Sequence, residues 1–158
     1  IVFGDWSSDV CSSDLVLFTG CRSSAPVTPL SVFVVSQEKV EGGRLIDTPD
    51  FPKLGYIGST PDLTITKLEA VGTNTSGQPG QPRSGVVIML RAEDAQSFSA
   101  LSEKAVMKKV LFMIGDTPLT ALTVVSPLPA AQTRSLQLTL MNQADQTKIE
   151  NELRKLTH

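Results

Sequence analysis

The chain has 158 residues, of which 41% are hydrophobic, and a formal net charge of −2 with a pI near 5.4. This length suits one domain with a buried core, and the lack of a basic excess argues against nucleic-acid binding, which needs clustered lysine and arginine. The single histidine is His158 and the only cysteines are Cys11 and Cys21, so the sequence predicts no Ser-His-Asp triad, metal site or cofactor.

The first residues of the chain are predicted to lie outside the domain. Residues 5–15, with the sequence DWSSDVCSSDL, resemble one reading frame of a sequencing-library adapter. The chain also begins with Ile1 instead of Met, as a truncated reading frame would. We therefore expect residues 1–15 to be foreign to the natural protein and exclude them from the fold prediction. The alternative is a natural tail that is rich in serine and aspartate.

Cys21 follows the sequence VLFTG, which resembles the end of a bacterial lipoprotein signal peptide. In that pattern a diacylglycerol is attached to the cysteine thiol, and a peptidase then cuts before the cysteine. Phe18 departs from the leucine that is usual three residues before the cysteine. The alternative is that residues 16–18 form a short buried strand with a free thiol behind it.

The lipoprotein interpretation assigns residues 16–30 to a lipobox remnant and a tether. Residues 22–29 are rich in serine and proline, as a tether between a lipidated cysteine and a folded domain would be. No segment approaches the length of a transmembrane helix. We therefore expect Cys21 to be the acylation site, and the protein to be anchored to a membrane of the bacterial cell envelope, facing the periplasm or the outer membrane.

The folded domain is predicted to cover residues 31–158. Its first strand is predicted at 31–36, where the sequence SVFVVS is rich in β-branched residues. Residues 38–52 are predicted to be irregular, because paired glycines and two prolines interrupt them. Further strands are predicted at 54–58 and 63–71, and the second of these alternates between apolar and polar residues.

The middle of the domain changes character twice. Residues 72–85 carry no apolar side chain and predict an exposed, mobile loop. Residues 85–90 form a continuous apolar run, as in a central strand. Apolar residues then recur every three or four positions over 93–107, which predicts a helix. Glu93 and Asp94 lie in its first turn, where negative charge is stabilised by the positive end of the helix dipole. This explains the two residues more simply than a role as a catalytic pair does.

The last third is predicted to contain three strands and a helix. Residues 109–114 and 119–126 predict a hairpin, with Lys108 and Lys109 at a strand entrance and not at a phosphate site. Apolar and polar residues alternate over 135–141, as in a strand with one solvent-exposed face. Asn142 is predicted to cap a final helix, whose apolar stripe is Ile149, Leu153 and Leu156. The predicted fold class is α+β, a mostly antiparallel sheet with two helices packed on one face.

From Leu63 to Leu156 the sequence resembles the periplasmic head region of SecD, a subunit of the bacterial protein-export machinery. The resemblance is carried by a strand at Gly85–Leu90, a helix with spaced alanine and phenylalanine that begins at Glu93, and the segment VMKKVLFMIGD at 106–116. Met107 stands where the family prefers glycine, Gly115-Asp116 inverts an Asp-Gly turn, and Ala121-Leu122 replaces Ala-Pro. These motifs concern packing and turns, so the resemblance implies a fold.

SecD itself has transmembrane helices and works with SecF to move exported chains with the energy of the proton gradient. That mechanism belongs to the membrane part, so the resemblance implies only the head-like module and its contact with polypeptide. We expect a non-catalytic domain that binds a protein or polypeptide partner by strand addition, with no small-molecule substrate. The alternatives are a structural component of an envelope complex, and an enzyme that uses carboxylates among Asp47, Asp50 and Asp62.

Overall fold

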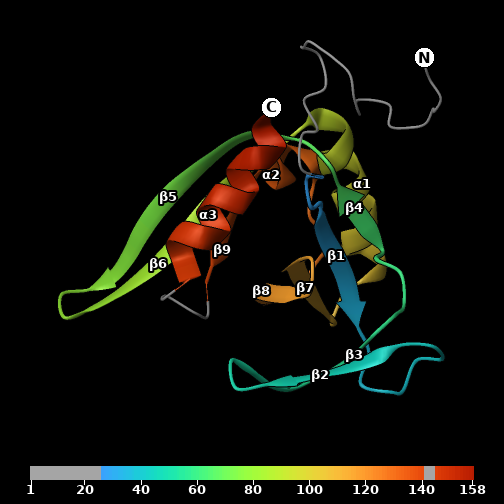
Figure 1. Ribbon diagram of the computed structural model, residues 1–158. Helices are drawn as coiled ribbons and strands as arrows, with labels where there is room; N and C mark the ends of the chain where they lie inside the picture. The colour runs from blue at the N-terminus through green and yellow to red at the C-terminus, as the bar shows by residue number, and fades with distance from the viewer. Residues whose placement is uncertain (1–25, 141–144) are drawn as a thin grey trace, which may run out of the picture.

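The computed structural model describes residues 26–140 and 145–158, and for residues 75–78 and 81–84 it describes the backbone alone (Figure 1). The adapter-like segment, Cys21 and Asn142 lie outside the described residues. Within these described residues nine strands and three helices follow one another, with a final 3₁₀ turn, and the predicted α+β class is confirmed. The strands are β1 (Leu30–Val35), β2 (Arg44–Thr48), β3 (Phe51–Ile57), β4 (Leu63–Ile65), β5 (Leu68–Gln78), β6 (Gln81–Leu90), β7 (Lys109–Ile114), β8 (Thr117–Thr123) and β9 (Ser135–Thr139). The helices are α1 (Ala92–Lys104), α2 (Ala130–Thr133), α3 (Gln146–Arg154) and the 3₁₀ turn η2 (Lys155–Thr157).

The strands form three separate antiparallel sheets. Sheet A has the order β4-β1-β7-β8, sheet B is the hairpin β2-β3, and sheet C has the order β5-β6-β9. Figure 1 shows sheet C arching over the molecule with α3 beneath it, while sheet B closes the opposite end. The described helices are all too short or too polar to cross a lipid bilayer.

Sheet A is buried on both of its faces at its centre. Val32 and Phe112 face the larger core, which sheet C, α1 and α3 complete. Phe33 and Leu111, the next residues along each strand, face a second core under sheet B. Successive side chains on a strand point to opposite faces, so a strand buried on both faces needs an unbroken apolar run. The predictions of β1 and β7 from such runs are confirmed.

Residues 38–52 are not irregular throughout, as predicted, because β2 runs from Arg44 to Thr48 and pairs with β3. Ile46 is the one buried residue of β2, so the strand lacks the apolar alternation that predicts strands. Sheet B is joined to β1 by a bridge in which Ser36 and Tyr56 exchange backbone hydrogen bonds of 2.8 and 2.7 Å. The backbone ladder therefore forms this hairpin with little apolar burial on its first strand.

The predicted strand at 63–71 is divided between two sheets. Leu63 and Ile65 pair with β1 in sheet A, whereas Leu68 begins β5 in sheet C. Thr66 and Lys67, which separate the two strands, are exposed. The apolar alternation is correct on each side of this break, but it cannot show that the chain changes sheet between them.

The prediction of a mobile loop at 72–85 was wrong. Residues 68–78 and 81–90 pair along their whole length as the hairpin β5–β6, and Gly80 makes the turn with φ of +96°. A ladder of backbone hydrogen bonds does not need apolar side chains, so a polar composition could not exclude it. Figure 1 shows the tip of this hairpin projecting beyond α3.

The helix predicted at 93–107 begins at Ala92 and ends at Lys104. Glu93 and Asp94 do lie in its first turn, and both form ion pairs with Arg91, at 2.8 and 3.3 Å. The helix ends early because Lys108 N–H closes a turn on the carbonyl of Ala105 at 2.9 Å. The short helix α2, at residues predicted only as a connection, and α3 complete the helical part.

Candidate functional site

The three aspartates considered for an enzyme site do not converge. The Asp62 carboxylate accepts a hydrogen bond from the backbone N–H of Val34 at 2.7 Å, and that of Asp47 accepts one from the N–H of Lys53 at 2.9 Å. Asp50 is exposed in the turn between β2 and β3. Two of the three carboxylates therefore hold backbone amides, which is a structural use. In the described parts of the chain, no group of His, Cys, Asp and Glu side chains is placed to hold a metal ion.

A groove lies at the start of the edge strand β8, where three parts of the molecule meet. One side is the tip of sheet B and the other is the start of α3. Its apolar surface comes from buried or half-buried residues, so the floor is fixed by the two cores. The floor residues are Phe51, Ile114, Pro118, Leu119 and Ile149. We call this feature the β8 groove.

The rim of the β8 groove is polar. Asp50, Asp145 and Glu152 contribute carboxylates, and Lys148 contributes an ammonium group. Glu152 is already paired with Lys155 at 2.6 Å. An apolar floor with a small number of polar groups around it is the usual composition of a site that binds another molecule.

The groove is adjacent to an edge strand of sheet A. Within the described residues β8 pairs with β7 alone, so its other edge belongs to no ladder. Pro118 lacks a backbone N–H, so the strand offers donors only before and after that residue. At the opposite end of sheet A, β4 has three residues and presents a much shorter edge. The sequence alone gave no basis for choosing an edge, and the position of the groove favours β8.

Sequence reasoning missed the β8 groove because its lining comes from three distant segments, 48–51, 114–119 and 145–152. Asp50 is the one candidate residue from the sequence that lines it. Phe51 and Leu119 read as ordinary core residues in the sequence, and most of their surface is indeed buried. The groove combines residues from the tip of sheet B, from β8 and from α3, which is a tertiary relationship.

Solved structures that share this fold include two of SecDF, although no protein-family model and no curated protein matches the sequence. The first is a crystal structure of SecDF in a super-membrane-facing form, with a TM-score of 0.60 and 16% identity over 82% of this chain and 19% of that chain. The second is a structure of SecDF, described as a membrane component that enhances protein export, with a TM-score of 0.56 and 17% identity over 82% of this chain and 63% of that chain. The chain thus spans less than two thirds of either structure. At this identity the likeness shows the fold, and the resemblance inferred from the sequence is confirmed at that level.

Proposed function

We propose that this chain is a non-catalytic polypeptide-binding domain of the bacterial cell envelope, linked to protein export. The observation that carries the proposal is the β8 groove, an apolar hollow beside an unpaired strand edge. An extended polypeptide would lie along β8, with backbone hydrogen bonds to its free edge and an apolar side chain against Phe51 and Ile149. The likeness to part of SecDF, a component that enhances protein export, supports this class of partner.

The groove suits a polypeptide for two physical reasons. A strand edge supplies regularly spaced donors and acceptors that only another extended backbone can satisfy in full. The floor then provides room for one or two apolar side chains, without the converging donors that would recognise a particular small molecule. This combination gives weak sequence preference, as expected for a domain that contacts many exported chains before they fold.

The proposal is tested by adding a reduced and alkylated, permanently unfolded polypeptide to the isotope-labelled chain and recording backbone amide shifts. We expect changes along β8, at the tip of sheet B and at the start of α3. Thr117 lines the β8 groove, so Thr117→Trp fills it and should weaken binding by about tenfold or more. Losing about 1.4 kcal/mol of binding free energy corresponds to that factor. Thr64→Trp is the matched control, since Thr64 is also an exposed threonine, on the opposite edge strand of sheet A.

Two results would count against this function. Shift changes confined to β4 or to sheet C would place the binding elsewhere. No response to polypeptide, together with purification in a fixed complex, would favour the structural role in an envelope assembly. In either case circular dichroism must show that Thr117→Trp is folded.

We further propose that Cys21 is the acylation site and that the domain is held on the membrane by a lipid anchor. The support is the pattern VLFTG before the cysteine and the serine- and proline-rich stretch after it. Expression behind an intact lipoprotein signal peptide should give a membrane-bound protein that metabolic labelling with a fatty acid marks. Cys21→Ser should release it to the soluble fraction, and unchanged membrane association and labelling would contradict the anchor.

A further inference from the structure

The connection between α1 and β7 contains a backbone conformation that favours glycine. Met107 has φ of +66° and is the third residue of the turn closed by Lys108 N–H on Ala105. Its N–H donates to the carbonyl of Val124 at 2.6 Å, and the N–H of Val124 donates to the carbonyl of Lys108 at 3.0 Å. Met107 and Lys108 thus face the single residue Val124 in a β-bulge whose first position is normally glycine.

The same place exposes two apolar side chains. Met107 is 78% exposed, and Val125, which follows its hydrogen-bonded partner, is 73% exposed. A methionine here stores backbone strain that glycine would avoid, and it also leaves apolar surface in water. Both effects oppose folding stability. Strained residues of this kind cluster at sites that bind other molecules.

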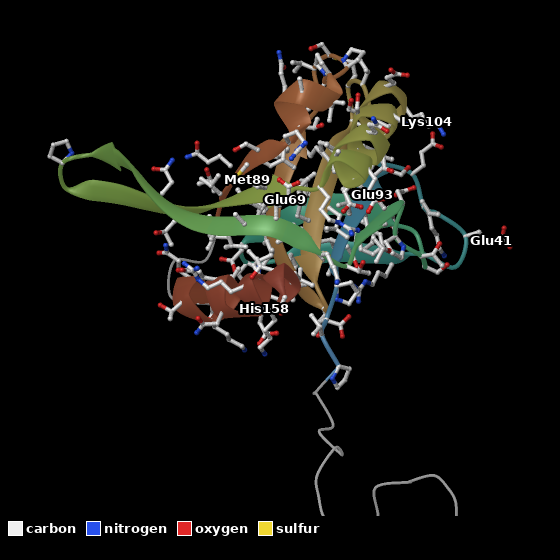
Figure 2. All side chains as sticks on the ribbon, turned by 90° about the horizontal axis from the view of Figure 1, so that it is seen from above. Glu41, Glu69, Met89, Glu93, Lys104 and His158 are labelled. Atoms are coloured by element: carbon white, nitrogen blue, oxygen red, sulfur yellow. The ribbon has the colours of Figure 1, made fainter. Side chains whose placement is uncertain are left out.

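Three exposed lysines lie close to Met107 in the sequence. Lys104 ends α1 and projects into solvent in Figure 2, and Lys108 and Lys109 follow Met107 directly. Within the described residues none of the three forms an ion pair, and Glu103 is the only acidic residue in the segment 103–109. We call Met107, Val125 and these three lysines the bulge tip.

We propose that the bulge tip contacts an anionic phospholipid surface, with Met107 and Val125 entering the boundary between headgroups and acyl chains and the lysines pairing with lipid phosphates. Exposed apolar side chains followed by lysines that form no ion pair in the described residues are complementary in charge and polarity to such a surface. Both side chains are highly exposed and so project outward, which suits insertion into a bilayer. A peptide partner would instead need a groove. The tip lies at the Lys109 end of β7, and the β8 groove lies at the Ile114 end, so the two surfaces are separate.

The test uses the full chain with the change Cys21→Ser, which removes the acylation site, in reducing buffer. This protein is mixed with vesicles of two compositions. We expect co-sedimentation with vesicles of equal parts phosphatidylglycerol and phosphatidylcholine, weaker binding as salt rises, and little binding to pure phosphatidylcholine. Met107→Gly and the double change Lys108→Gln with Lys109→Gln should each weaken binding by about tenfold. Leu45→Ser and Lys67→Gln are matched controls, because Leu45 is an exposed apolar residue and Lys67 an exposed lysine far from the tip in sequence.

Met107→Gly relieves the backbone strain, so loss of binding by this variant cannot be attributed to unfolding. Equal binding to both vesicle compositions, or equal binding by Met107→Gly and the parent chain, would overturn the inference. So would capture of an acidic polypeptide by the tip without any binding to vesicles. Thr117→Trp should bind vesicles normally, so this test and the test of polypeptide binding can fail independently.

Discussion

The Asp62 carboxylate accepts the backbone N–H of Val34 at 2.7 Å, and through this bond the segment before β4 continues the pairing of β1. The N–H of Asp62 also donates to the carbonyl of Val32 at 2.9 Å. A residue that the sequence offers as a catalytic candidate is therefore part of a strand edge. Its side chain replaces a backbone acceptor where the ladder of β4 has ended.

Asp62→Ala should lower the free energy of unfolding by about 1 kcal/mol, because the amide of Val34 loses its charged acceptor. Asp62→Asn keeps an oxygen at this position and should lower it by less than Asp62→Ala. Urea denaturation of both variants measures the difference. Equal losses for the two would show that the acceptor oxygen is not what matters.

Ser102 is 1% exposed and joins α1 to the segment before α2. Its hydroxyl donates to the carbonyl of Ser99 at 2.6 Å and accepts the N–H of Leu128 at 2.9 Å. Ser102→Ala leaves that amide without its partner and should cost about 2 kcal/mol in thermal or urea unfolding. Ser97→Ala is the control, since the Ser97 hydroxyl is exposed and bonds only to a carbonyl within α1; it should be nearly neutral.

Gly55 allows sheet B to approach β1. Its φ is +136°, and a Cβ at this position would lie 2.6 Å from the backbone oxygen of Ser36. Gly55→Ala should therefore destabilise the protein by about 3 kcal/mol, through strain and displacement of the hairpin. Gly72→Ala is a suitable comparison, because a Cβ there would meet nothing within 4 Å. Similar losses at both glycines would argue against the close approach as the cause.

Met107→Gly should raise the free energy of unfolding by about 1 kcal/mol. The strain of a left-handed backbone at methionine is larger than the additional conformational entropy that a glycine loses on folding. Met107→Ala keeps a Cβ and should give little of this gain. Chemical denaturation distinguishes them. A stability equal to or below that of the parent chain for Met107→Gly would mean that the methionine side chain makes a stabilising contact.

The sequence predicted the fold best where burial is complete. The runs of β1 and β7 and the three-to-four spacing of α1 each record which faces are covered, so their elements were found with small errors at the ends. Prediction failed where a paired strand has a mostly polar sequence, as at Arg44–Thr48 and in the tip of β5–β6. In those places side-chain polarity carries no signal of the ladder.

The site was less predictable than the fold. The β8 groove forms because the fold brings Phe51 and Ile149 to the same place, and nothing in either local sequence encodes that proximity. The sequence already showed a methionine at position 107, where the SecD head regions that it resembles prefer glycine. Its meaning needed the φ angle of +66° and the two hydrogen bonds to Val124.

Sheet A has a further consequence for the dynamics of the molecule. Its two central strands serve both cores at once, so sheet C cannot separate from β1 and β7, nor sheet B from their other side, without uncovering residues such as Phe112 or Leu111. The amides of these two strands should therefore exchange with deuterium last of all, at a rate set by complete unfolding. The end of β5–β6 projects beyond α3 in Figure 1, and its amides should exchange many times sooner.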